Sequence, residues 1–150
     1  MDNYGGGAGI DCDRFVCLLV YNPTIKMFLV EDRPEHWKPY GGQTRVLGGH
    51  VEDTDENIKA AAYREMMNGM GIAPSDLSHV CKCVDYDNNN GTGKLHLFDY
   101  FCFTEGKGHT ESRIQNPQRK KLYYSKRGGE KIHPLDRWAM GVFLDSLQDI

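Results

Sequence analysis

The chain reads Gly48-Gly49-His50-Val51-Glu52, passes through an acidic loop, continues as Ala60-Ala61-Ala62-Tyr63-Arg64-Glu65-Met66, and closes with Gly71-Ile72. Apolar residues recur at helical spacing after the loop and predict a helix over roughly 55–70. Thr54 or Asp55 is of a type that caps a helix, and glycine is usual just past a helix end. The predicted apolar face comprises Ile58, Ala61, Ala62, Met66 and Met70.

Other elements are predicted on both sides of this stretch. Residues 1–11 are glycine-rich and are expected to be a flexible segment, followed by a single domain over 12–150. Apolar runs predict strands at 15–20, 26–30, 45–47, 80–86 and 95–103, with a hairpin turn at Asn22-Pro23 and loops at 31–45 and 87–93. Residues 105–131 form a polar, basic stretch. A helix is predicted over 134–147, with an apolar stripe that includes Ala139, Phe143 and Trp138.

Composition limits the class of protein. The 150 residues carry a net charge of −3, which gives the whole molecule no strong attraction to nucleic acid or anionic membrane. No apolar run approaches the length of a membrane span, so we expect a cytoplasmic protein. The five cysteines include Cys81-x-Cys83 on one face of a strand, and we interpret them as small buried residues in a reducing compartment, with a zinc or disulfide role as the alternative.

The stretch from Gly48 to Ile72 resembles the Nudix box, G-x5-E-x7-R-E-U-x-E-E-x-G-U with U apolar, a loop and helix that hold Mg²⁺ against a pyrophosphate. Arg64-Glu65 matches its Arg-Glu, and the loop is similar to the L-P-G-G-H-V-E often seen in that family, with Leu47 in place of proline. The resemblance implies an α/β fold in which a mixed sheet lies between helices as an α/β/α sandwich. The order of predicted strands and helices agrees with it.

The resemblance also implies roles for the matched residues. The Gly48 carbonyl and Glu65 would be metal ligands, with Glu52 in the loop as a further one. Arg64 would orient the carboxylates by ion pairing, and Glu65 and Arg64 would belong to the catalytic group.

The spacing from Gly49 to Arg64 is one residue longer than the pattern. Either Asp55 or Glu56 therefore stands for the first glutamate of the pattern, and Glu56 is the expected third catalytic residue.

The second half of the box departs from the pattern, because Asn68 and Gly69 occupy the places of its paired glutamates. Carboxylates at i, i+3 and i+4 share one helix face and suit the oxygen preference of Mg²⁺. Asn68 offers only a neutral oxygen as a metal ligand, and Gly69 offers none. A loss of about 4 kcal/mol of metal catalysis costs roughly a thousandfold in rate. We therefore expect weak or absent Mg²⁺, unless Asp99 or Glu105 supplies a distant carboxylate.

Ligand contacts are expected around the glycine turn. Gly48, Gly49 and His50 would face phosphate, with Arg45 just before them. Trp37 and Tyr40, in the proline- and glycine-rich loop, could stack on a base, although most aromatic side chains serve the core.

The segment 113–127 combines cations with aromatic residues, which fits contact with RNA or a protein partner, or else a solvated loop. Its members are Arg113, Arg119, Lys120, Lys121, Tyr123, Tyr124, Lys126 and Arg127.

Three functional hypotheses follow. The first is a binding protein for a nucleoside-diphosphate-linked ligand, such as an ADP-ribose-like molecule, a dinucleotide or an NTP, with hydrolysis weakened or lost. The second is an active Mg²⁺-dependent pyrophosphohydrolase that uses Glu65 and loop acids. The third is an RNA- or protein-docking module that uses segment 113–127. A homodimer is compatible with each hypothesis.

Overall fold

The computed structural model describes residues 12–36, 41–71, 76–87, 94–106, 122–127 and 131–148. The expected flexible segment 1–11 lies outside them. The elements are β1 (Cys12–Asn22), β2 (Met27–Asp32), β3 (Thr44–His50), α1 (Ile58–Met70), β4 (Ser78–Asp87), β5 (Lys94–Thr104), β6 (Leu122–Ser125) and α2 (Pro134–Gln148). The strands form one sheet in the order β4-β5-β1-β3-β2-β6. β1 and β5 run parallel and the other neighbours antiparallel, so the sheet is mixed.

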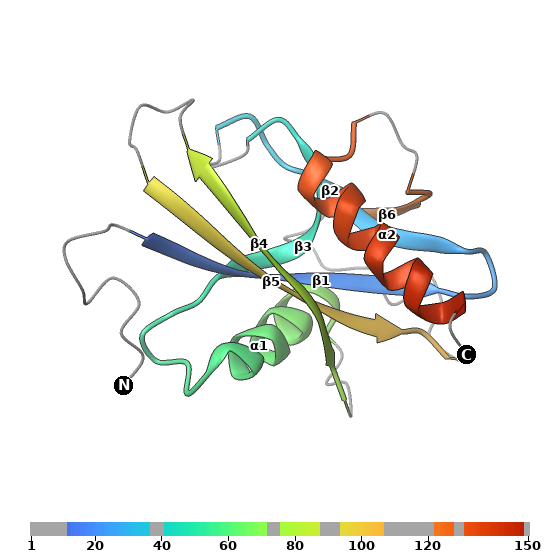
Figure 1. The fold of residues 1–150 in the computed structure, drawn as a ribbon, viewed down its shortest axis with the longest axis horizontal. Coiled ribbons are helices and arrows are strands. Elements are labelled where there is room, and N and C mark those ends of the chain that lie inside the picture. The colour runs from blue at the N-terminus through green and yellow to red at the C-terminus, as the bar shows by residue number, and fades with distance from the viewer. Residues whose placement is uncertain are drawn as a thin grey trace.

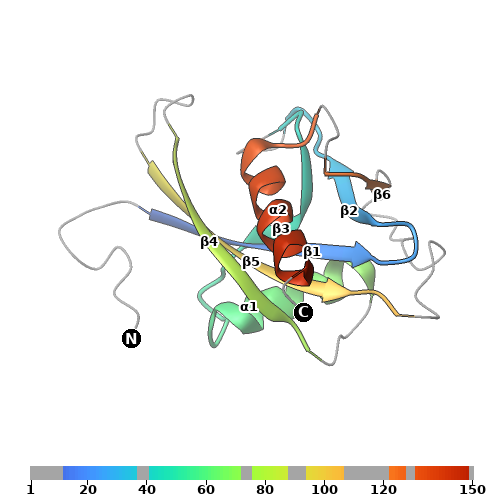
Figure 2. The same ribbon diagram turned by 45° about the vertical axis from the view of Figure 1, so that its right-hand side comes forward.

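The two helices cover opposite faces of the sheet (Figure 1, Figure 2). Alternate residues of β1 supply the two cores, because successive side chains on a strand point to opposite faces. Val16 and Leu18 pack with α1, whereas Phe15 and Cys17 belong to the core under α2. The predicted α/β/α sandwich is confirmed. Neither helix in the described ranges has the length and apolarity needed to span a bilayer.

The predicted hairpin at Asn22-Pro23 forms, but its arms separate after two residue pairs. β1 and β2 pair only at Tyr21–Phe28 and Asn22–Met27, and β3 lies between them beyond that point. β3 is therefore hydrogen-bonded directly to the central strand β1. Its residues Gly48 and Gly49 lie beside β1 in the middle of the sheet.

Helix α1 begins three residues later than the sequence predicts. Asn57 caps it, with its side-chain oxygen accepting a hydrogen bond from the Ala60 N–H at 2.8 Å. Asp55 is unavailable for this role because its carboxylate accepts from the Glu52 N–H at 2.7 Å. At the other end Gly71 adopts φ 68° and donates its N–H to the Met67 carbonyl, as predicted for a glycine after a helix.

The apolar stripe predicted on α2 is only partly buried. Ala139 and Phe143 lie in the core, but Trp138 is 51% exposed, and Met140 is buried instead. The polar stretch 105–131 also contains a strand that the sequence did not reveal, because β6 is only four residues long and pairs with the outer side of β2.

Candidate ligand site beside Gly48 and Gly49

The sequence predicts a turn at Gly48-Gly49, but both glycines lie within strand β3, where each meets close contacts. Gly48 pairs with Cys17, and a Cβ at position 48 would collide with the Val16 carbonyl oxygen and lie 3.2 Å from the Cys17 Cα. A Cβ at position 49 would lie 2.7 Å from the carboxyl carbon of Glu65. A larger residue at position 49 would therefore displace the Glu65 carboxylate from its place against the β3 backbone.

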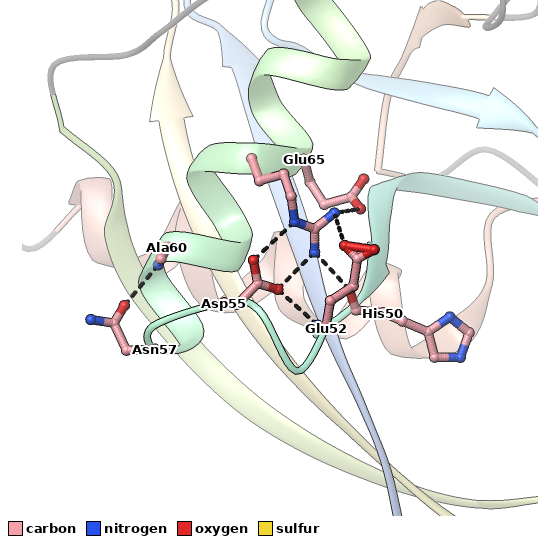
Figure 3. A network of polar contacts seen from close by, with 7 residues as sticks. His50, Glu52, Asp55, Asn57, Ala60 and Glu65 are labelled. Carbon is pink, nitrogen blue, oxygen red and sulfur yellow. Dashed lines mark hydrogen bonds and ion pairs between the residues drawn. The ribbon is translucent and has the colours of Figure 1, made fainter.

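Arg64 is the centre of a polar network that joins the loop to α1 (Figure 3). Its Nε and Nη2 donate to the two carboxylate oxygens of Asp55 at 3.0 and 2.9 Å. Its Nη1 donates to Glu65 Oε1 at 2.9 Å and lies 3.3 Å from Glu52 Oε2. Its Nη2 also donates to the His50 carbonyl oxygen at 2.9 Å. Arg64 thus binds the carboxylates of Asp55 and Glu65 directly, and its orienting role in catalysis stays a prediction.

The network shows which loop acid lies next to the arginine. Asp55 forms the bidentate pair with Arg64, whereas Glu56 is exposed to solvent. The hydrogen bonds from Arg64 lower the pKa of Asp55, and the same bonds raise the pKa of Arg64. Asp55 thus takes the place of the arginine-paired loop acid, and Glu56 remains a proposed catalytic residue without a described contact to this network.

The face of α1 that carries the box meets β3 through an apolar contact. A Cβ at position 69 would lie 3.1 and 3.2 Å from the two methyl carbons of Leu47, so Gly69 faces the Leu47 side chain. Asn68 is exposed one residue earlier on the helix. Glu65 is buried, with one carboxylate oxygen bonded to Arg64. These donors do not fit the carboxylate platform that Mg²⁺ requires, and none of the described His, Cys, Asp and Glu residues gather in threes around a possible metal position.

The two distant carboxylates are both bound to neighbouring side chains. Asp99 Oδ1 lies 2.9 Å from His79 Nε2, and Asp99 Oδ2 lies 3.8 Å from an Arg14 nitrogen. Glu105 accepts a hydrogen bond from the Tyr124 hydroxyl at 2.5 Å. Both carboxylates therefore already have a hydrogen-bonding or charged neighbour within the protein.

A pocket opens on the other side of β3, toward the face that α2 covers. The His50 ring lies 4.3 Å from the Phe15 ring, centroid to centroid, and Phe15 stacks on Phe98 at 5.0 Å. In Figure 3 the His50 side chain points away from Glu52 and Asp55. Burial lowers the pKa of His50, which favours the neutral ring. The pocket lining comprises Phe15, Val16, Cys17, Arg33, Arg45, Val46, Gly48, Gly49, His50 and Phe98.

This pocket brings together four of the predicted ligand residues, Gly48, Gly49, His50 and Arg45. Trp37 and Tyr40 lie outside the described residues. Sequence reasoning missed Phe15, which looked like an ordinary core residue of a buried strand. Its pairing with His50 across two strands is visible only once the register of β1 and β3 is known.

Arg45 contributes to the pocket wall, but its charge is neutralised within the core. Its Nε and Nη2 each donate to an oxygen of Asp136 at 2.8 Å, and Tyr100 donates its hydroxyl to the same carboxylate at 2.6 Å. Burial alone would raise the pKa of Asp136, but Arg45 holds it below its ordinary value. This pair connects β3 to α2 and leaves Arg33 as a second cation in the pocket lining.

Most of the basic segment 113–127 lies outside the described residues. Its last two cations, Lys126 and Arg127, are both exposed, and the Arg127 side chain lies against α2. Arg127 Nε donates to the Arg137 carbonyl at 3.1 Å, and a Cβ at position 141 would lie 2.7 Å from the Arg127 guanidinium carbon. Arg127 is therefore used to attach the segment to α2.

Comparison with known proteins identifies the fold. MutT protein from Methanosarcina mazei Go1 superposes with a TM-score of 0.72 at 18% identity, covering 95% of this chain and 99% of that one. MutT NUDIX hydrolase from Burkholderia pseudomallei gives 0.69 at 18% identity, covering 87% and 97%. The NUDIX domain of Shewanella oneidensis NrtR, solved with ADP ribose, gives 0.68 at 12% identity, covering 97% and 94%.

No curated protein sequence matches this chain. The family model described as NUDIX domain matches residues 13–123. This range includes α1 and, in the sheet, everything except the first residue of β1 and the last two residues of β6. The chain belongs to the NUDIX domain family.

Proposed function

We propose that this chain binds a nucleoside-diphosphate-linked molecule in the pocket beside Gly48 and Gly49 of β3, with hydrolysis weakened or lost. The observation that carries the proposal is the aromatic group of His50, Phe15 and Phe98 next to a glycine backbone whose loop is held in place by Arg64. A pocket of this kind suits a ligand with one aromatic and one anionic part.

Each part of the ligand has a partner of suitable chemistry. A nucleobase presents a π-face that stacks on aromatic side chains. The diphosphate would meet the backbone of Gly48 and Gly49, with Arg33 as the cation in the same lining. An ADP-ribose-like molecule, a dinucleotide and an NTP all have this division. The NrtR domain, which shares the fold, was solved with ADP ribose.

Weak hydrolysis follows from the donors on α1. Nudix hydrolases generally act on nucleoside diphosphate derivatives with a divalent metal such as Mg²⁺. Here Asn68 is neutral, Gly69 has no side chain, and Glu65 is bonded to Arg64. A helix face with one buried carboxylate lacks the charge to hold the metal and neutralise a pyrophosphate.

The test is thermal unfolding of the purified protein with ADP-ribose, dinucleotides and NTPs, each in Mg²⁺ and in EDTA, followed by analysis for hydrolysis products. A ligand that binds only the folded state raises the unfolding midpoint by mass action. We expect a shift in both buffers without products. Products that appear only with Mg²⁺ would instead establish the pyrophosphohydrolase hypothesis.

Two histidine variants locate the binding site. His50→Ala removes the ring that lies 4.3 Å from the Phe15 ring and should reduce the ligand-induced shift. His79→Ala is the matched control, because His79 packs on Phe101 in the core on the α1 side of the sheet. Equal shifts for both variants would place the ligand elsewhere. No shift with any compound would favour docking through segment 113–127.

A further inference from the structure

Leu47 fills the space beside Gly69. Its side chain is fully buried in the core on the α1 side, together with Met66 and Met70 of the helix. Two of its methyl carbons lie 3.1 and 3.2 Å from the place where a Cβ of residue 69 would be. The helix position at which the Nudix box carries a glutamate is thus covered by an apolar side chain.

We propose that Leu47 and Gly69 form a matched pair that closes this position to a metal-binding carboxylate, so that the chain holds its ligand without a divalent cation on α1. The inference rests on the proposed ligand-binding function and adds that this binding does not require a metal ion on α1. Two residues, on separate elements, together exclude the metal.

The surroundings of position 69 oppose a charged side chain. The Cβ of such a side chain would lie 3.1 and 3.2 Å from the two Leu47 methyl carbons, so the side chain would start against an apolar surface that offers a carboxylate no partner. The nearest cation of the box, Arg64, has five N–H donors. Four of them donate hydrogen bonds, two to Asp55 and one each to Glu65 and the His50 carbonyl. The same guanidinium also forms an ion pair with Glu52 at 3.3 Å, so Arg64 already faces three carboxylates.

The same contacts explain how the acidic loop is held in place by the protein's own groups. Asp55, Glu65 and Glu52 all lie within 3.3 Å of Arg64 nitrogens, so one arginine side chain joins the three carboxylates. Glu65 keeps its position under Gly49 through this bond rather than through a metal. The diphosphate then meets a preformed loop, and we expect it to bind through the backbone of Gly48 and Gly49 and through Arg33 without Mg²⁺.

The experiment measures Mn²⁺ binding to the ligand-free protein by electron paramagnetic resonance. Four proteins are compared: wild type, N68E/G69E, L47A, and L47A/N68E/G69E. We expect saturable binding only in the triple variant, with an affinity at least about tenfold above that of N68E/G69E. Saturable binding to the wild type, or equal binding by the double and triple variants, would overturn the proposal, as would a folded triple variant that binds no Mn²⁺.

Two controls keep the result interpretable. N68E alone changes an exposed position and should fold normally without gaining Mn²⁺ binding, and binding by this variant would contradict the role of position 69. Should the triple variant not fold, L47V/N68E/G69E removes less volume and is expected to give the same order of affinities. Ligand is absent throughout, so failure of the ADP-ribose test leaves this result unchanged. Conversely, Mn²⁺ binding to the wild type leaves ligand binding intact.

Discussion

Leu47 on β3 and Gly69 on α1 are in such close contact that even a methyl group at position 69 would lie 3.1 Å from a Leu47 methyl carbon. Gly→Ala within a helix ordinarily stabilises by about 1 kcal/mol. We predict that Gly69→Ala loses this gain in the wild type but shows it in the Leu47→Ala background, where the new methyl group has room. Urea unfolding of the four proteins measures the coupling. Equal effects of Gly69→Ala in both backgrounds would contradict the contact.

Removing the central arginine of the loop should destabilise the protein. Arg64→Gln leaves Asp55 and Glu65 close together without their cation, and we expect a loss of about 1–3 kcal/mol. Lys59→Gln is the matched control: Lys59 and Asp76 form an ion pair at 3.4 Å, but their side chains are 49% and 72% exposed. That change should cost less than about 0.5 kcal/mol. Similar losses in urea unfolding would show that Arg64 has no special role.

The buried pair under α2 should be more sensitive still. Asp136→Asn keeps the shape of the side chain but leaves the Arg45 guanidinium without its buried counter-charge. We expect a loss of about 3–5 kcal/mol in the free energy of unfolding. Asp145→Asn changes an exposed carboxylate on the same helix and should have little effect. A small loss for Asp136→Asn would indicate that solvent reaches Arg45.

Two histidines should make the stability depend on pH. Burial lowers the pKa of His133, and its Nδ1 accepts a hydrogen bond from the Leu135 N–H at 3.1 Å. Burial also lowers the pKa of His50. The unfolded chain therefore binds more protons than the folded one below about pH 6.5. The contribution is present above that pH and is lost as the pH falls toward the lowered values.

Urea unfolding between pH 7.5 and pH 5.5, both values being about one unit from the ordinary histidine pKa, measures this loss. His133→Asn keeps a side chain that can accept the cap hydrogen bond and should reduce the slope. His50→Ala should remove a further part. An unchanged slope in the double variant would assign the pH dependence to other groups.

Two positions with positive φ should respond in opposite directions. Lys26 has φ 56° in the β1–β2 turn, where a side chain is unfavourable, so Lys26→Gly should stabilise by about 0.5–1 kcal/mol. Gly71 has φ 68° after α1, and Gly71→Ala should cost about 1 kcal/mol. Thermal unfolding of both variants tests the pair, and the same sign of change in both would be inconsistent with the two backbone conformations.

The fold was accessible from the sequence where signals are local. Helical spacing and Gly71 located α1, and apolar runs located the central strands, but Gly48 and Gly49 continue β3 instead of forming the predicted turn. The cap at Asn57 was missed because Asp55 is engaged by Glu52 and Arg64, a competition that residue type alone does not express. β6 was missed because four residues in a polar stretch carry too little pattern.

The site depended on contacts between distant residues. Arg45 and Asp136 are 91 residues apart in the chain, and the sequence around each residue does not predict that they form an ion pair. The contact between the His50 and Phe15 rings depends on strand register. The choice between Asp55 and Glu56 was open because the loop is one residue longer than the pattern, and only its folded path brings Asp55 to Arg64.

The Leu47–Gly69 contact also constrains how this chain can change over evolutionary time. A return to a metal-binding helix needs a carboxylate at position 69 and a smaller residue at position 47. The first change alone forces a charge against a buried leucine, and the second alone opens a cavity. Each single step gives a less stable protein than the starting one. Descendants of this sequence are therefore expected to keep both residues or to replace them together.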